Sequence, residues 1–153
     1  MKLAEALLLR ADIQKKLESL KDRISKNTVV QDGEKPSEDP NELLKQAMLI
    51  AEQLRKIILA INEANLGGQT GKARSLTAAL ADRDSLIYRH SIVQSAATSA
   101  AKPPERYGVK EIRWVKTVDV SALQKQADEL AKQIREVNAE IQSANWSIEV
   151  QNF

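Results

Sequence analysis

The sequence contains no cysteine, and only 3% of its 153 residues are aromatic. Without cysteine there can be no disulfide, no thiol nucleophile and no thiolate metal site, which suits a reducing compartment. With so few aromatic side chains, the core has to be built from Leu, Ile, Val and Ala. Aliphatic burial stabilises a fold by only ~25 cal/mol per Å². We therefore expect the chain to bury further area by forming a homo-oligomer.

The sequence also lacks an excess of charge of one sign and any long hydrophobic run. Charged residues make up 29% of the chain, yet 23 basic and 21 acidic side chains leave a formal charge of +2. This balance predicts no binding to nucleic acid and no attraction to an anionic membrane. The Leu-rich N-terminus resembles a signal peptide, but Glu5 and Arg10 interrupt it and its spacing continues to Ile24. We therefore expect a cytoplasmic protein.

Apolar residues recur at steps of three and four in four stretches of the chain, which predicts helices that each bury one face. The clearest start signal is Asp39 before Pro40, and the adjacent Pro103 and Pro104 end the third stretch. The predicted fold is mainly α, with four long antiparallel helices in a bundle that forms one domain over residues 1–153. The expected helices cover residues 2–26, 40–65, 76–101 and 120–145.

A different pattern precedes the last helix. Residues 110–118 alternate with a period of two, and residues 28–31 are rich in β-branched side chains. These segments predict a small two-stranded β-ribbon, which has to pack on the helices because such a ribbon is marginally stable alone.

Several charged residues fall on or beside the predicted buried faces. Arg10 and Arg83 occupy buried positions, and in the third helix the row is Leu76, Leu80, Arg83, Ile87 and His90. Since an unpaired buried charge costs several kcal/mol or more, each needs a partner. Two interpretations remain open: ion pairs that fix helix register, or arginines that hold an anionic small molecule. The candidate ligand site consists of Arg10, Arg83, Asp84, His90 and Asp128.

Other motifs give no catalytic or metal site. The Gly-rich segment 67–73 follows a predicted helix, and Ala73 stands where a phosphate-binding loop needs a hydroxyl, so we interpret it as a flexible hairpin turn. His90 is the only histidine, and no second histidine or regular carboxylate pair accompanies it, which excludes a recognisable metal site. We expect no cofactor, and no serine has a plausible base.

Six segments together resemble the septicolysin-like family of small bacterial proteins. This resemblance implies no established catalytic residues, although the family name implies a cytolysin. The segments that carry the resemblance are 1–12, 29–34, 38–40, 76–84, 114–120 and 145–146.

Three functions follow as hypotheses. The leading one is a non-enzymatic cytoplasmic protein that acts through self-assembly or through binding another protein. The second is a binding protein or unassigned enzyme with a polar pocket for an anionic small molecule. The third, a membrane-active protein, comes from the family name, although no segment approaches the ~20 apolar residues of a membrane span.

Overall fold

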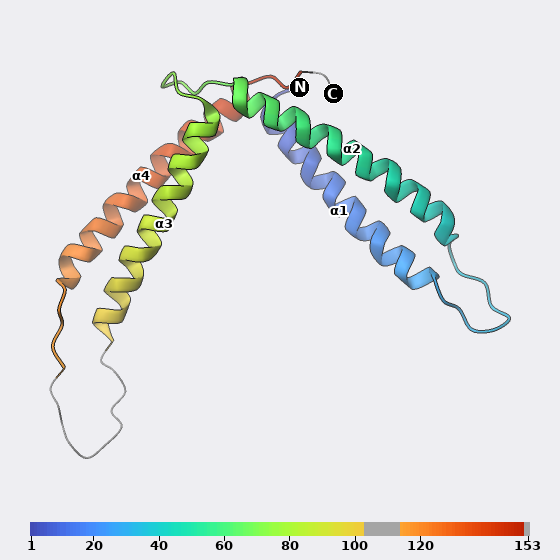
Figure 1. Ribbon diagram of the computed structural model, residues 1–153, viewed down its shortest axis with the longest axis horizontal. Helices are drawn as coiled ribbons and strands as arrows, with labels where there is room; N and C mark the ends of the chain where they lie inside the picture. Colours follow the sequence, from blue (N-terminus) through green and yellow to red (C-terminus); the bar gives the residue numbers. More distant parts are fainter. Residues whose placement is uncertain (103–113, 152–153) are drawn as a thin grey trace, which may run out of the picture. The chain divides into compact units, whose positions relative to one another are not determined.

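The structure of the protein is a computed structural model that describes residues 1–102 and 114–151 (Figure 1). It contains four helices, α1 (Leu3–Asn27), α2 (Pro40–Gly67), α3 (Leu76–Ala101) and α4 (Val120–Ser147). The prediction of a mainly α fold with four long helices is confirmed. No helix within the described ranges is long and apolar enough to cross a membrane.

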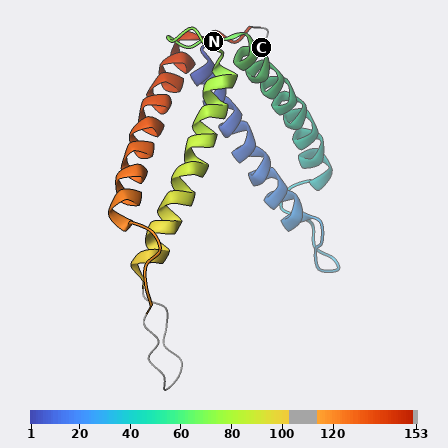
Figure 2. The same ribbon diagram turned by 60° about the vertical axis from the view of Figure 1, so that its left-hand side comes forward.

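The contacts between residues divide the chain into two compact units. The first unit comprises Met1–Gln69 together with the chain from Ser143 onward, and the second comprises Thr70–Gln142. In the first unit α1 and α2 lie side by side as an antiparallel hairpin, and in the second unit α3 and α4 do the same (Figures 1 and 2). The organisation of the whole chain as a single domain stays a prediction.

The core of the first unit lies along the facing sides of α1 and α2. Leu3, Leu20, Ile57 and Ile61 are almost completely buried there. Their three- and four-residue spacing keeps them on one side of each helix, which is why the predicted rows became the core. Further buried residues in this core are Ala6, Ile13, Leu43, Ala47 and Ile50.

Short polar side chains begin three of the helices, as the sequence signals indicated. Asp39 precedes α2 and its carboxylate accepts a hydrogen bond from the backbone N–H of Asn41 at 2.8 Å. Ser75 caps α3 by accepting from Ala78 N–H at 3.1 Å, and Asp119 caps α4 through Ala122 N–H at 3.1 Å. These caps satisfy N–H groups that have no partner inside the helix.

The predicted β-ribbon was wrong for the residues that can be compared. Neither 28–31 nor 114–118 forms a strand, and residues 110–113 lie outside the described part of the chain. Val29 and Val115 are 83% and 74% exposed, so neither packs as a strand residue. β-branched residues favour a strand only when a neighbouring strand packs beside them, and the described parts of the chain contain no such strand.

Instead, the buried side chain of Asn27 holds the loop between α1 and α2. Its Oδ1 accepts from Ser37 Oγ at 2.9 Å and from the backbone N–H of Glu38 at 3.0 Å, while its Nδ2 donates to the carbonyl of Arg23 at 2.9 Å. Arg23 also forms an ion pair with Glu38. The loop is therefore closed by side-chain bonds to the last turns of α1.

Replacing Asn27 with Ala should lower the free energy of unfolding by ~1–3 kcal/mol, because three part-buried hydrogen bonds of its side chain are lost, including the one from the backbone N–H of Glu38. Urea unfolding followed by circular dichroism measures this change. The control is Asn138→Ala at an exposed position of α4, where we expect no loss. Equal stability of Asn27→Ala and the native chain would contradict this account of the loop.

The two ends of the described chain pair with each other inside the first unit. Leu3 N–H donates to the carbonyl of Ile148 and Val150 N–H donates to the carbonyl of Met1, both at 2.9 Å. Lys2 forms an ion pair with Glu149 at 3.0 Å. The C-terminal segment thus folds back on its own chain.

The second unit buries a slightly different row of α3 from the one predicted. Ile87 is 46% exposed, whereas Leu86 is half-buried. The row that faces inward runs from Arg83 to Leu86, three residues on, and then to His90, four residues on. The predicted row took the four-residue step first, from Arg83 to Ile87. Both orders are compatible with one helical face, and the sequence alone did not decide between them.

Candidate functional site

A buried carboxylate organises the beginning of α3 in the second unit. Glu140 of α4 has a side chain that is only 6% exposed. Arg74 donates to both its oxygens, from Nε at 2.8 Å and from Nη2 at 2.9 Å. Lys72 Nζ lies 3.5 Å from Glu140 Oε2, and Asp82 forms a second ion pair with Arg74. The four side chains, together with Thr70, are called the Glu140 cluster below.

The loop that carries Thr70, Lys72 and Arg74 is closed by its own hydrogen bonds. Thr70 N–H donates to the carbonyl of Arg74 at 2.8 Å, and Ala73 N–H donates to the carbonyl of Thr70 at 2.9 Å. Ala73 has a φ of 58°, in the left-handed region that side chains other than glycine seldom adopt. The segment interpreted as a flexible turn therefore includes a hydrogen-bonded turn that aims Arg74 at α4.

The cluster strongly favours the ionised form of Glu140. The hydrogen bond from Arg74, assisted by one from Thr70, lowers the pKa of Glu140 to about 2. Such a carboxylate binds a proton poorly near neutral pH, so it is not suited to general acid or base catalysis. The geometry instead suits a structural role, in which a paired charge fixes the loop to α4.

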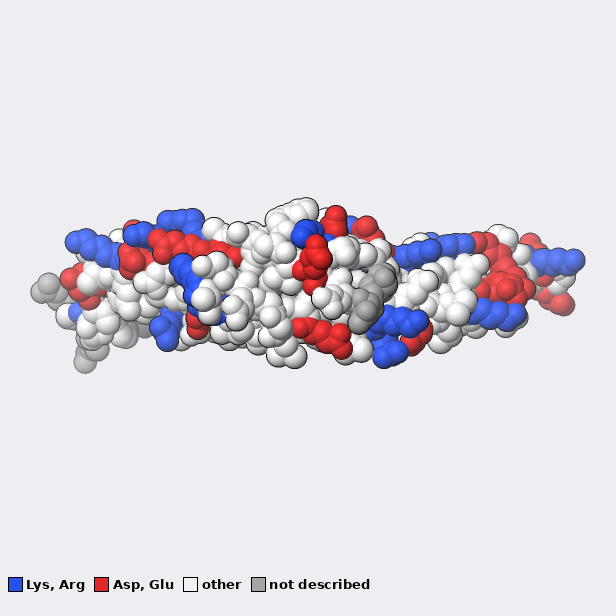
Figure 3. All heavy atoms as spheres, turned by 90° about the horizontal axis from the view of Figure 1, so that it is seen from above, with Lys and Arg blue, Asp and Glu red and all other residues white. Residues whose placement is uncertain are grey.

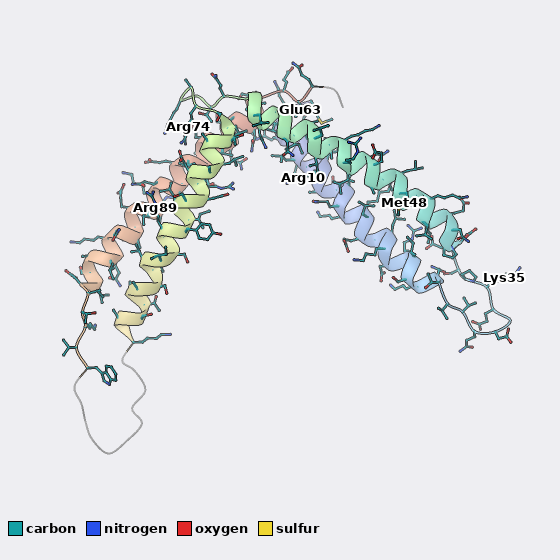
Figure 4. The ribbon with its side chains drawn as sticks, viewed as in Figure 1. Arg10, Lys35, Met48, Glu63, Arg74 and Arg89 are labelled. Carbon is teal, nitrogen blue, oxygen red and sulfur yellow. The ribbon has the colours of Figure 1, made fainter. Side chains whose placement is uncertain are left out.

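An open cavity of about 420 Å³ adjoins this cluster and is lined by residues of α3, α4 and the loop. Its charged lining consists of three basic residues, Lys72, Arg74 and Arg89, and two acidic ones, Asp82 and Glu136, so the positive excess is a single charge. Figure 4 labels Arg74 and Arg89 in this unit. Because Arg74 is already bound to Glu140 and Asp82, it has little capacity left for a ligand.

The residues of the candidate ligand site fall in both units. Arg10 is a half-buried residue of α1, and its Nε is buried without a hydrogen-bond partner among the residues that the structure describes. Arg83 pairs with its neighbour Asp84, with Nη2 and Oδ1 2.8 Å apart. His90 is half-buried on α3 and Asp128 is exposed on α4. The structure thus brings Arg83 and Asp84 together, while a pocket shared by all five residues stays a prediction.

Among residues 1–102 and 114–151, no group of three or more His, Asp or Glu side chains could hold a metal ion. Charges of both signs are intermingled on the face in Figure 3, separated by uncharged areas. That face offers no extended basic or acidic surface. The more informative surface feature is therefore a row of exposed apolar side chains on α2.

A second apolar row runs along the exposed side of α2, and the sequence analysis missed it. Its members follow one another at steps of three or four residues, with Arg55 and Asn62 completing the row, so they share one helical face. Met48 is 64% exposed and Leu66 is 71% exposed. The signal was present in the sequence, but the row through Leu43 was the stronger one. We call this row the outer stripe: Leu44, Met48, Ala51, Ile58 and Leu66.

The Glu140 cluster was also missed, for a different reason. Glu140 adjoins Ile141 in the buried row of α4, yet the sequence analysis did not single it out as a candidate buried charge. Arg74 lies in an irregular loop, where helical periodicity gives no information on the direction of a side chain. Only the three-dimensional path of the loop shows that these two residues meet.

Comparison with known proteins gives a family and a fold. A family described as of unknown function (DUF6847) matches residues 10–150. The chain is also similar to a functionally unknown conserved protein from Corynebacterium diphtheriae, known from its crystal structure. The two share 30% identity over 99% of each chain, with a TM-score of 0.90. No curated protein matches the chain. The septicolysin-like resemblance was therefore wrong, because the matching family is another one, and its cytolysin label no longer applies.

Proposed function

Because this chain belongs to the DUF6847 family, whose function is unknown, we propose its function from the residues exposed on its own surface. We propose that it is a non-enzymatic protein that associates with further copies of itself through the outer stripe of α2. The single observation that carries this proposal is the exposure of the stripe.

An apolar helix face in water normally indicates a missing partner. A helix with one apolar face needs one neighbour, whereas α2 has one apolar face packed on α1 and a second face exposed. Leu59, which is 51% exposed, widens this second face beside Ile58. Contiguous apolar surface of this kind is typical of interaction sites, and association through a shared face is the common solution in symmetric assemblies.

The polar groups of the chain support a non-enzymatic role. Arg83 is paired with Asp84, and Arg74 is paired with Glu140 and Asp82. A catalytic site usually combines a cleft with groups whose pKa values lie close to the working pH. The low pKa of Glu140 does not meet that requirement.

Replacing Met48 with Glu tests the proposal. We expect the native chain to have a mass above its 17.0 kDa monomer in light scattering at micromolar concentration. The variant should associate at least ~100-fold more weakly, because a two-fold interface loses two buried Met side chains worth ~1.5–3 kcal/mol each. Circular dichroism should be unchanged, since Met48 is 64% exposed.

The matched control is Leu8→Glu on α1, where the leucine is 63% exposed but belongs to no second apolar row. This variant should associate as the native chain does. A monomeric native chain at every concentration would refute the proposal, and so would equal loss of association in the Met48 and Leu8 variants.

A further inference from the structure

We infer that the outer stripe pairs with the same stripe of a second copy in an antiparallel arrangement, with the turn from Glu52 to Arg55 at the two-fold axis. The inference rests on the proposed self-association, and it specifies the partner surface and its direction. It is carried by the order of charges and apolar residues along α2.

The middle of the stripe is an ion pair. Arg55 donates to both carboxylate oxygens of Glu52 through one edge of its guanidinium, from Nη2 to Oε1 at 2.7 Å and from Nε to Oε2 at 2.9 Å. The pair is exposed, with side-chain exposures of 64% and 50%. An exposed pair of this kind contributes little to the stability of its own helix, although it places polar groups on an otherwise apolar face.

The apolar residues lie on both sides of this ion pair. Leu44 and Met48 precede it, and Ile58 and Leu66 follow it. Met48 and Leu59, both exposed, are equally far from the midpoint between Glu52 and Arg55 along the helix. A two-fold axis at the ion pair therefore places the apolar half that precedes it on the apolar half that follows it in the other copy.

The charges favour this direction over a parallel one. In an in-register parallel pair, Arg55 would lie beside Arg55 and Glu52 beside Glu52, which places like charges together. In the antiparallel pair, Arg55 of each copy lies close to Glu52 of the other, so four charges alternate in sign around the axis. Antiparallel helices also place their opposite dipole ends together.

Complementary charge reversal tests whether the ion pair lies at the centre of the interface. Glu52→Arg alone and Arg55→Glu alone each give the centre of the interface four like charges, and we expect each variant to self-associate roughly 10-fold more weakly. A 1:1 mixture of the two variants restores opposite charges across the axis. Sedimentation velocity should show that the mixture associates nearly as well as the native chain. Rescue by mixing cannot come from an ion pair that acts only within one helix.

The matched control is Lys26→Glu. Lys26 belongs to an exposed pair of α1, with Asp22 at 2.6 Å, and therefore lies on another helix. Its reversal should leave association unchanged. If the mixture of the Glu52 and Arg55 variants associates no better than either variant alone, the placement of the ion pair at the axis is wrong.

Engineered cysteines test the direction independently, and the native chain has no cysteine to interfere. Under oxidation, a mixture of Met48→Cys and Leu59→Cys should form a disulfide between the two variants, and neither variant should cross-link with itself. Self-cross-linking of either variant would indicate a parallel pair and overturn the inference while the proposed self-association stands. A native chain that remains monomeric would overturn both.

Discussion

Replacing Arg74 with Ala is expected to lower the free energy of unfolding of the second unit by ~3–5 kcal/mol. In the variant, Glu140, whose side chain is 6% exposed, loses the two hydrogen bonds that Arg74 donates to its carboxylate. Lys72 remains at 3.5 Å, but an ammonium group cannot replace two parallel hydrogen bonds. A loss of this size is a large part of the stability of a small unit. Chemical unfolding followed by circular dichroism measures it.

Two further variants separate this effect from a general effect of charge. Arg74→Lys keeps the charge and loses the bidentate geometry, so its stability should lie between those of the native chain and Arg74→Ala. Lys26→Ala removes an exposed pair with Asp22, whose side chains are 70% and 59% exposed. That change should cost less than ~1 kcal/mol. Similar losses in Arg74→Ala and Lys26→Ala would show that the Glu140 cluster is not a structural centre.

Acidification is expected to remove ~3 kcal/mol of stability through Glu140 alone. Its pKa falls from an ordinary 4.5 to about 2 in the folded chain, chiefly because Arg74 donates hydrogen bonds to the carboxylate. Folding therefore favours the ionised form. The contribution is complete above pH 4.5, where the unfolded chain is also ionised, and it declines as the pH falls toward 2.

The variant Glu140→Gln isolates this contribution from the other carboxylates. At neutral pH it should be less stable than the native chain, and its stability should change less between pH 4.5 and 2 because the group that titrates there is absent. Urea unfolding at a series of pH values gives the difference. Parallel curves for the native chain and the variant over this range would contradict the assignment of a low pKa to Glu140.

The helices were predictable because local signals and periodicity agreed. Asp39 and Pro40 gave the start of α2, and the row through Leu43, Ile50 and Ile57 gave the face that packs on α1. Each signal depends on residues within a few positions of one another. Such local information survives in a single sequence without knowledge of the rest of the fold.

The errors came where distant contacts decide the structure. The β-prone segment after Asn27 is held by hydrogen bonds to Ser37 and Glu38, which no short-range pattern could reveal. On α3, choosing Leu86 over Ile87 depends on the direction in which α4 lies. Side chains in residues 114–118 do alternate with a period of two, yet strand formation also requires a neighbouring strand.

The candidate site was harder to predict than the fold. Arg10 and Arg83 drew attention because they fall on the predicted buried faces of their helices. Periodicity, however, says only on which face of a helix a side chain lies. It does not give the partner. The pairing of Arg83 with Asp84 joins immediate neighbours, and that of Arg74 with Glu140 joins distant ones. Neither follows from helical spacing.

The pairing of Met1 and Leu3 with the residues around Ile148 has a consequence for synthesis on the ribosome. The second unit is a continuous stretch, so every residue it needs has been made once Gln142 is added. The first unit begins earlier in the chain, but its closing hydrogen bonds need Val150. The first unit is therefore completed after the second, although its helices α1 and α2 are translated earlier. While the second unit can already fold, the α1–α2 hairpin still lacks the hydrogen bonds with Ile148 and Val150.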